Sequence, residues 1–338
     1  MINEVYRLIA PKQIRVDFVD EQIGDSVVVR PTYLSICAAD QRYYMGTRGK
    51  EVLSQKLPMA LIHEAVGKVV FDPQKEFAVG ENVVLIPNTP VETDEIIKEN
   101  YLRSSKFRAS GFDGFMQNVV LMDRGRIISF DKIPERTAVL LEVLSVILNA
   151  IENFEQKSHI RRRRIGIWGD GNLGFITALV LKTMYPDSHI SVLGLTLERM
   201  HYFPFVDEMY SVNDLPDDFK IDHAFECVGG TGSESAINQI IDCINPQGSI
   251  VLMGVSENNV ALNTRMVLEK GLVLLGNSRS GYSDFKKGIE FLSANVRAME
   301  YMDMLISEEI EINSIKDMNR AFEHDKMNDF KTVMKWNI

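Results

Sequence analysis

The chain has 338 residues, of which 45% are apolar and 25% are charged, a composition typical of a globular protein with room for two ordinary domains. The net charge of −10 and the isoelectric point near 5.2 argue against a broad surface for nucleic acid or anionic membranes. No apolar run approaches the roughly 20 residues that span a bilayer, and the first fifteen residues lack the apolar core of a signal peptide. We therefore expect a cytoplasmic protein.

The three cysteines form no recognisable framework. They are Cys37, Cys227 and Cys243, which lie far apart in the sequence. Three such residues are too few for a disulfide scaffold or a four-cysteine zinc site, and they suit a reducing compartment.

The first part of the chain is a series of short strand-like runs. Between residues 27 and 130, runs such as SVVVRPTYLSIC and FMQNVVLMD are separated by Gly, Pro and Asn. This pattern predicts a compact, antiparallel, partly barrel-like domain. From residue 137 to about residue 156, apolar residues recur at helical spacing without a breaker. We expect one helix there, leading out of the first domain.

From about residue 163 to residue 276, strand-like and helix-like segments alternate. The apolar runs RIGIWG, HISVLG, DHAFECVG, GSIVLMGV and LVLLGN are interspersed with helical stretches such as LGFITALVLKTMY and SESAINQIIDCI. Such alternation predicts an α/β domain with a parallel sheet covered on both faces. The rest of the chain mixes helices with short strands and could complete either domain.

A glycine-rich turn, GDGNLG, follows the first of these strands. Gly169 permits the tight turn, Gly171 lets backbone amides approach a pyrophosphate, and Gly174 lets the following helix pack closely. Asn172 and Leu173 complete the turn, and the N-terminus of the helix would face the anion. Glycines also serve ordinary turns, but a glycine turn between a strand and a helix favours a dinucleotide site.

The position that would hold an adenosine ribose carries no acid. About 20 residues after the turn, where NAD-binding domains place Asp or Glu, this chain has Gly194. Its absence removes repulsion of a 2′-phosphate and leaves room, while Thr196 and Arg199 can donate hydrogen bonds or positive charge. The pattern predicts NADPH rather than NADH, unless this loop is merely solvated.

Four consecutive arginines, residues 161–164, could suggest a second phosphate site. They lie at the start of the first strand, whereas ligands of such sheets bind beyond the carboxyl ends of the strands. We expect a solvated edge or a contact with a partner.

Several possible metal ligands occur before the glycine turn. Cys37 lies in ICAAD, His63 and Glu64 in LIHEAVG, and Glu142 in LLEVLSV. A thiolate, an imidazole and carboxylates are ligands that zinc accepts, and three protein ligands with an open fourth position form a catalytic site. Taken singly, each also has a structural interpretation: Cys37 as a small buried side chain, His63 as a core histidine and Glu142 as a charge near a helix start.

In this order, these motifs resemble the zinc-dependent medium-chain dehydrogenase/reductase family, in its sorbitol-dehydrogenase-like branch. The resemblance covers essentially the whole chain, including DGFMQNVVL and DHAFECVGG. It implies a GroES-like, β-rich catalytic domain over residues 1–140, completed by about residues 277–338. A Rossmann domain with a doubly wound parallel sheet, binding NADP, would occupy residues 141–276.

The resemblance also implies roles for individual residues. Cys37, His63 and Glu142 match the ligands of the catalytic zinc, and Glu64 matches an acid that can join or leave the coordination shell. Asp40 matches the carboxylate that orients the histidine ligand, and Tyr43 matches an active-site tyrosine.

The chain departs from the family pattern at four places. Ala39 stands where many members have the Ser or Thr that begins the proton relay, so zinc-bound water, Glu64 or Tyr43 would have to serve. Ile62 replaces a glycine before the histidine, and Val143 replaces a proline after the ligand Glu142. Residues 87–111, where many members carry four cysteines, contain none, so we expect no structural zinc.

Within this family the chain is most similar to the bacterial ribulose-5-phosphate reductases of CDP-ribitol, teichoic acid or capsule synthesis. The segments that carry this likeness include RPTYLSICAADQRYYMG and NTRMVLEKGLVLLGNSRSG. The resemblance implies NADPH-dependent reduction of D-ribulose 5-phosphate to D-ribitol 5-phosphate. The candidate ligands of the substrate phosphate are Arg42, Arg48, Lys50 and Arg279.

Two alternative functions stay open at this point. One is an NAD-dependent zinc dehydrogenase that oxidises an unphosphorylated polyol, and the other is a non-catalytic scaffold relative. We further expect a homodimer, formed through the exposed sheet edge of the inserted domain, and a complex with a cytidylyltransferase of the same pathway.

Overall fold

The computed structural model describes the backbone of all 338 residues and every side chain except those of Leu197 and Met200. The chain divides into two compact units. Unit 1 comprises Met1–Ser145 and Arg279–Ile338, and unit 2 comprises Val146–Ser278. Unit 1 is therefore discontinuous in sequence, because unit 2 is inserted into it.

Unit 1 is built mainly from antiparallel strands. Before the insertion its strands are β1 (Ile2–Ala10), β2 (Gln13–Asp20), β3 (Val27–Ser35), β4 (Met59–Ala60), β5 (Glu64–Phe71), β6 (Asn82–Leu85), β7 (Asn88–Thr89), β8 (Lys106–Phe107), β9 (Val120–Met122) and β10 (Ile127–Ser129). The helices of this part are α1 (Ala38–Tyr44), α2 (Lys50–Lys56), η1 (Glu99–Tyr101), η2 (Arg124–Arg126), α3 (Glu135–Ala138) and the start of α4 (Leu141–Lys157). After the insertion follow α9 (Tyr282–Ala294), α10 (Val296–Met304), β17 (Ile306–Ile312), α11 (Ile315–Asp325) and β18 (Lys331–Trp336).

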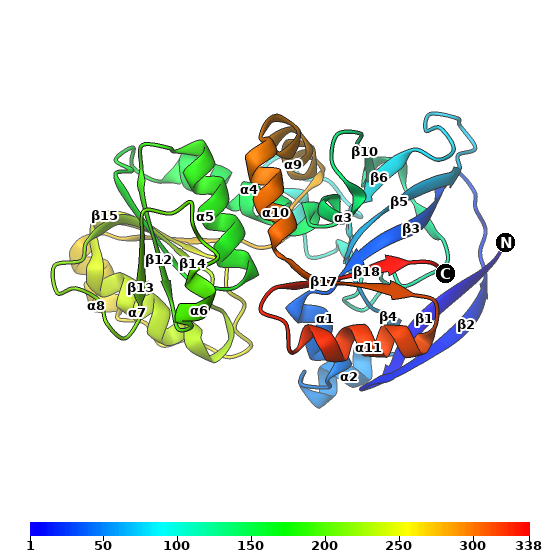
Figure 1. Cartoon of the computed structure of the whole chain (residues 1–338), viewed down its shortest axis with the longest axis horizontal. Helices are drawn as coiled ribbons and strands as arrows, with labels where there is room; N and C mark the ends of the chain where they lie inside the picture. Colours follow the sequence, from blue (N-terminus) through cyan, green and yellow to red (C-terminus); the bar gives the residue numbers. More distant parts are fainter. The chain divides into compact units, whose positions relative to one another are not determined.

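The C-terminal segment completes the main sheet of unit 1. The strand order in this sheet is β10-β6-β5-β3-β18-β17, and β9 also pairs with β3. In Figure 1 the red strand β18 runs beside the blue strand β3, with which it pairs antiparallel. A smaller sheet, β2-β1-β4, encloses the same core, which contains Leu34, Phe115, Phe322 and Trp336. Strands from both ends of the chain thus build one domain.

The predicted continuous helix over residues 137–156 is wrong, because two helices occur there. α3 ends at Ala138 and α4 begins at Leu141. Between them the amide of Leu140 donates to the carbonyl of Thr137, three residues back, so the chain tightens instead of continuing as an α-helix. Residues on both sides of this turn are buried and apolar, so apolar spacing gave no sign of the break.

Unit 2 is a doubly wound α/β domain. Its strands are β11 (Arg164–Trp168), β12 (His189–Gly194), β13 (Glu208–Ser211), β14 (Ile221–Glu226), β15 (Ile244–Leu252) and β16 (Val273–Gly276). Its helices are α5 (Asn172–Met184), α6 (Leu197–Met200), η3 (Gly230–Gly232), α7 (Ser233–Cys243) and α8 (Thr264–Lys270), together with most of α4. The six strands are all parallel, in the order β13-β12-β11-β14-β15-β16. Of these six strands, only the short β13 was not predicted from the sequence.

Helices cover both faces of this sheet. Residues of α7, including Ile237 and Ile240, pack with Trp168 and Ala224. Phe225, which follows Ala224 and points to the opposite face, packs against Phe154 of α4, with ring centroids 5.2 Å apart. Because both faces of the sheet are buried, the sequences of its central strands are nearly continuous apolar runs without polar alternation.

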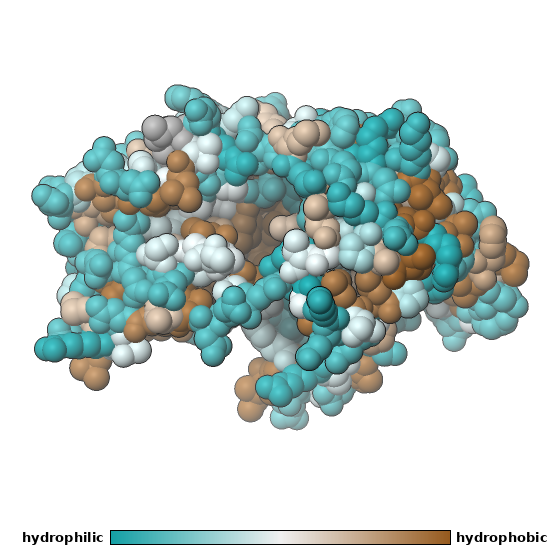
Figure 2. All heavy atoms as spheres, turned by 90° about the horizontal axis from the view of Figure 1, so that it is seen from below, coloured by the Kyte–Doolittle hydropathy of each residue, from teal (hydrophilic) through white to brown (hydrophobic). Residues whose placement is uncertain are grey.

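The surface is mostly polar. On the face shown in Figure 2, hydrophilic residues predominate and apolar residues form separate patches. Within the part of the chain that the structure describes, no helix is long and apolar enough to cross a membrane.

A buried histidine in β14 predicts a loss of stability in acid. His223 is fully buried, accepts a hydrogen bond from the amide of Ser249 (3.1 Å) and lies 4.2 Å from the ring of His159. Burial, followed by the charge of His159, lowers the pKa of His223 to about 4. In the unfolded chain the residue takes up its proton near pH 6.5, so stability is complete above that pH and falls between about pH 6.5 and 4.

We expect unit 2 to lose about 3 kcal/mol over this pH range from His223 alone. Hydrogen exchange of β14 peptides between pH 7 and pH 4.5, corrected for intrinsic rates, measures the loss. His223→Asn keeps an acceptor for the Ser249 amide but cannot become charged, so its stability should depend less on pH. Equal pH dependence in the two proteins would contradict the assignment.

Candidate functional site

Strand register gathers the predicted metal ligands at one end of the main sheet of unit 1. Ser35, at the end of β3, pairs with Glu64, at the start of β5, and with Val333 of β18. Cys37 follows β3 by two residues, and His63 immediately precedes β5. Residues separated widely in sequence are therefore neighbours because three strand ends meet.

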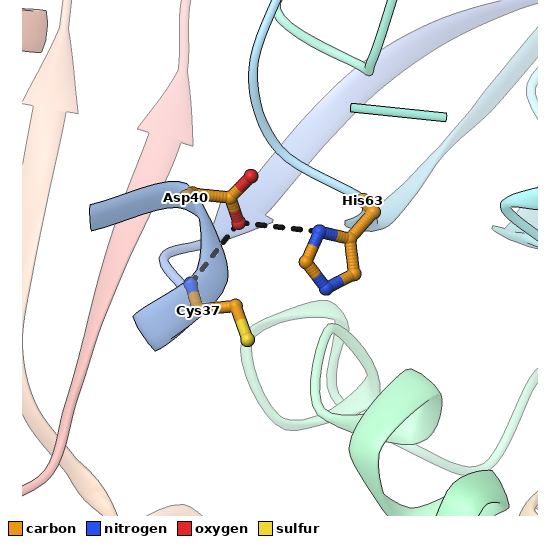
Figure 3. A group of neighbouring side chains, drawn as sticks. All are labelled: Cys37, Asp40 and His63. Atoms are coloured by element: carbon orange, nitrogen blue, oxygen red, sulfur yellow. Dashed lines mark hydrogen bonds and ion pairs between the residues drawn. The ribbon is translucent and has the colours of Figure 1, made fainter. Parts of the chain in front are cut away.

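A fully buried carboxylate fixes the orientation of His63. Asp40 is in the first turn of α1, and its carboxylate lies 3.3 Å from Nδ1 of His63. The carboxylate also accepts hydrogen bonds from the amides of Cys37 (3.3 Å) and Ile62 (3.0 Å). Figure 3 shows Asp40 beside the upper nitrogen of the imidazole and the Cys37 sulfur on the same side of the ring, below Asp40. Contact with Asp40 through Nδ1 leaves Nε2 of His63 available for another partner.

Two acidic residues complete the cluster around His63. One potential ligand atom each from Cys37, Asp40 and His63 lies within 4.8 Å of the others, and the same holds for His63, Glu64 and Glu142. Glu142 is in the first turn of α4 and only 6% exposed. Burial raises the pKa of the Glu142 carboxyl to about 7. A thiol, an imidazole and carboxylates withdrawn from water form a donor set that suits zinc.

Glu64 is held by a lysine from the C-terminal strand. Both oxygens of Glu64 contact Nζ of Lys331, at 2.6 and 2.7 Å, and this ammonium group also donates to the carbonyl of Ile36 (3.1 Å). Burial alone would lower the pKa of Lys331, but the adjacent Glu64 raises it, with a net upward shift. Glu64 is thus already paired within the protein.

Two of the candidate phosphate ligands lie over aromatic rings. The Arg279 guanidinium lies 4.6 Å from the ring centroid of Phe107, whose centroid is 5.5 Å from that of His63. Arg48 lies 4.9 Å above the ring of Tyr43, which is itself 2% exposed. Of the other candidate phosphate ligands, Arg42 is in the last turn of α1, and Lys50 begins α2 and is exposed.

In unit 2 the three glycines of the turn have distinct geometry. Gly169 has φ +126°, in a region that favours glycine, and a side chain at Gly174 would collide with the carbonyl oxygen of Gly169. A side chain at Gly171, by contrast, would meet nothing within 4 Å. The backbone of the turn is therefore closely packed on one side and open at Gly171.

A pocket of about 450 Å³ lies beyond the carboxyl ends of the strands of unit 2. Of the predicted cofactor-binding residues, Gly169, Gly171 and Arg199 line it, together with Gly194 and Asp170. Asn172, Leu173, Gly174 and Thr196 are not among its lining residues. The pocket also has walls that sequence analysis did not identify, from Val212, Asn213, Cys227, Val228, Ser235, Ala236 and Gln239.

The expectation that Gly194 leaves free space is wrong. A Cβ at Gly194 would lie 2.6 Å from Cβ and 2.7 Å from Oδ2 of Asp170. The side chain of Asp170, the second residue of the glycine turn, fills that space. An acid is therefore present at this end of the sheet, but it comes from the turn after β11 and not from the end of β12.

The comparisons with known proteins agree with this arrangement. Residues 24–134 match the family described as alcohol dehydrogenase GroES-like domain, and residues 135–336 match glucose dehydrogenase C-terminus. Ribulose-5-phosphate reductase of Bacillus spizizenii is 50% identical over 341 residues, covering 100% of both chains. Ribulose-5-phosphate reductase 1 of Staphylococcus aureus is 51% identical over 339 residues, covering 99% of each.

A solved structure, S. aureus TarJ in complex with NADPH, superposes with a TM-score of 0.90 and 47% identity over 100% of both chains. The chain belongs to the ribulose-5-phosphate reductase family of zinc-dependent medium-chain dehydrogenases/reductases. This membership confirms the predicted family and the predicted fold class, a GroES-like domain together with a Rossmann sheet.

The structure explains why glycine and proline are the usual family residues at positions 62 and 143, where this chain has Ile62 and Val143. Ile62 has φ +71°, a left-handed conformation that glycine adopts without strain, which explains why glycine is usual before the histidine. Val143 is in the first turn of α4, where a backbone amide needs no helical partner and proline is tolerated. Neither substitution removes a side chain of the ligand cluster.

A partly buried ion pair helps to hold the segment in which many family members carry four cysteines. Glu99 of η1 receives two hydrogen bonds from Arg126, at 2.9 and 3.1 Å, and a third from the amide of Tyr282 (2.9 Å). Arg126 also donates to the carbonyl of Asn88. These contacts attach residues 88–101 to the rest of unit 1.

The arginine run lies at the amino end of β11, as expected from its sequence. Arg161 pairs with Asp222 (2.9 Å), Arg164 lies 3.5 Å from Glu208, and the Arg162 guanidinium lies over the rings of Phe154 and Tyr185. These contacts are within unit 2 and anchor the entry to its sheet.

Proposed function

We propose that the chain reduces D-ribulose 5-phosphate to D-ribitol 5-phosphate with NADPH, for CDP-ribitol and teichoic acid or capsule synthesis. The observation that carries the proposal is 50% and 51% identity, over nearly the whole length, to two curated ribulose-5-phosphate reductases. The buried cluster around His63 and the pocket at the glycine turn supply the two kinds of site that such a reaction needs.

The residues present suit zinc and NADPH. Cys37, His63 and Glu142 would hold the metal, because soft and hard donors lie around His63, which Asp40 already orients. The open backbone at Gly171 would admit a pyrophosphate. Zinc supplies a Lewis acid for the ketone oxygen, and NADPH supplies the hydride.

The protein itself has to position groups and deliver a proton. Ala39 has no hydroxyl for the usual relay, and Lys331 holds both oxygens of Glu64. Of the two side chains considered for this role, Tyr43 is left as the proposed proton donor, and its ring lies beside the cations of Arg48 (4.9 Å) and Lys56 (5.9 Å).

Among the candidate phosphate ligands, Arg279 has the strongest support. The ring of Phe107 contacts both its guanidinium and the His63 imidazole, so the cation would be near a small substrate at the ligand cluster. Burial lowers the pKa of Arg279, because desolvation disfavours its charged form. A bound phosphate would offset this cost, and guanidinium groups bind phosphate through two parallel hydrogen bonds.

The test compares two substrates with two cofactors. We expect turnover with ribulose 5-phosphate and NADPH to exceed turnover with ribulose, or with NADH, by at least about tenfold in kcat/KM. Arg279→Ala should reduce kcat/KM for ribulose 5-phosphate by about tenfold or more and leave the weak reaction with ribulose unchanged. Elemental analysis should find zinc in the wild type and less in Cys37→Ser.

Other outcomes point to the alternatives. A preference for NAD⁺ and an unphosphorylated polyol would identify a polyol dehydrogenase. A protein that contains no zinc, does not respond to added zinc and shows no turnover would be a scaffold relative.

We also propose a homodimer and the cytoplasm as the compartment. β16 is an edge strand of its sheet, and Val273 in it is 37% exposed, so a second copy could extend the sheet. Light scattering measures the mass in solution. The same experiment with a cytidylyltransferase of the pathway tests that proposed partner.

A further inference from the structure

Asp170 occupies an unusual place beside the pocket of unit 2. Its Oδ2 accepts hydrogen bonds from the amides of Thr196 (2.7 Å) and Leu195 (3.0 Å), the first two residues after β12. The adjacent residue Gly169 donates its amide to the carbonyl of Leu193 at 2.8 Å. The glycine turn is thus tied to the loop after β12 by backbone and side-chain contacts together.

This arrangement excludes a side chain at Gly194. All three atoms closest to a Cβ built there belong to the Asp170 side chain, at 2.6, 2.7 and 2.8 Å. These distances are shorter than a carbon can approach without displacement of one residue or the other. Asp170 and an acid at the end of β12, the usual ribose ligand of NAD sites, cannot occupy the site together.

The same contacts set the position of the residues that would meet a 2′-phosphate. Leu195 and Arg199 both line the pocket. Thr196, whose amide donates to Asp170, immediately precedes α6, and α6 carries Arg199. The amide of Arg199 in turn bonds to the carbonyl of Thr196 (3.1 Å). A displacement of the loop at Asp170 would therefore move Arg199.

The charge of Asp170 is directed at these amides. Two amides donate to one oxygen of Asp170, and these N–H dipoles partly offset its repulsion of a nearby anion. Asp170 therefore differs from an acid whose oxygens face the ribose.

We propose that Asp170 is a positioning residue that selects the phosphorylated cofactor. It excludes a side chain at Gly194 and holds the loop after β12 so that Arg199 meets the 2′-phosphate. This inference rests on the proposed use of NADPH and identifies how the chain achieves that preference.

The test measures binding of two cofactor fragments by calorimetry: ADP-ribose and its 2′-phosphorylated form. The variants are Gly194→Ala, Asp170→Gly, the double variant and Asp170→Asn, which retains an oxygen acceptor. We expect Gly194→Ala and Asp170→Gly each to weaken binding of the 2′-phosphorylated fragment by about tenfold or more, and binding of ADP-ribose by less than about threefold.

A double-mutant cycle tests the steric part. In the Asp170→Gly background, Gly194→Ala has no side chain to displace, so its additional effect on binding should be small. Asp170→Asn should keep most of the preference, because its oxygen can still accept the amides. Thermal unfolding identifies any variant that does not fold. If Asp170→Gly does not fold, Asp170→Asn still tests the role of residue 170, because it keeps an oxygen acceptor and a similar shape.

The outcomes separate the two proposals. A wild type that binds both fragments equally, or prefers ADP-ribose, would contradict the proposed use of NADPH. A wild type that prefers the 2′-phosphate, with variants that lose both fragments equally, would overturn the role of Asp170 alone. Tighter binding of the 2′-phosphorylated fragment by Asp170→Gly or Asp170→Asn would show that Asp170 repels the phosphate, which also overturns it.

Discussion

Replacing Lys331 with methionine is expected to destabilise unit 1 by about 3–5 kcal/mol in protein stripped of metal. Lys331 is 4% exposed and Glu64 is 1% exposed, so the substitution leaves a buried carboxylate without its counter-ion. It also removes the hydrogen bond to the carbonyl of Ile36, which leads into Cys37. Removing one partner of a buried ion pair is strongly destabilising, whereas replacing both partners with well-packed apolar residues often changes stability little.

The same strand offers a matched control. Lys335 pairs with Glu311 at 2.9 Å, but both side chains are exposed, and Lys335→Met should reduce the stability of unit 1 far less than Lys331→Met does. Hydrogen exchange by mass spectrometry reports unit 1 separately from unit 2. Adding Glu64→Gln to Lys331→Met should recover part of the lost stability, because a neutral amide is less costly to bury. Equal effects of the two lysine substitutions would show that burial of the pair does not matter.

Gly174→Ala is expected to damage both stability and cofactor binding. Its new methyl group would collide with the carbonyl oxygen of Gly169, a backbone atom that cannot move independently of the turn. Overpacking of this kind costs about 1–3 kcal/mol. The displaced turn should also weaken NADPH binding by at least about tenfold, which a fluorescence titration measures.

Gly171→Ala separates these two effects. Its backbone, with φ −94° and ψ −170°, suits alanine, and a Cβ there meets nothing within 4 Å. The weaker N-cap preference of alanine is offset by its smaller entropy in the unfolded chain, so stability should change by less than about 0.5 kcal/mol. Binding of NADPH should nevertheless weaken, because the methyl group occupies space that the pyrophosphate would approach. Unchanged affinity in Gly171→Ala would place the pyrophosphate elsewhere.

The sequence identified those features that depend on local pattern. The apolar runs after residue 163 predicted five of the six strands of unit 2. The residue types of Cys37, His63 and Glu142 made them possible ligands, the family resemblance singled them out, and the structure places them around His63. β13 was missed because it is only four residues long, an edge strand without a continuous apolar run.

Features that depend on long-range register could not be found in this way. Lys331 begins the strand KTVMKW, whose sequence alone does not show that Lys331 is buried and Lys335 is not. Only the pairing of β18 with β3 brings it to Glu64. Asp170 occupies a variable position of a glycine motif, so its contact with Gly194 appears only when β11 and β12 lie side by side.

The order in which these strands leave the ribosome has a consequence for metal loading. Unit 2 is one continuous segment and can fold as soon as its own residues have been synthesised. The sheet that gathers Cys37, His63 and Glu64 lacks β18 until residue 331 and its neighbours have emerged. During synthesis the second unit should therefore form first, and a well-ordered zinc site should arise only after almost the entire chain has been translated.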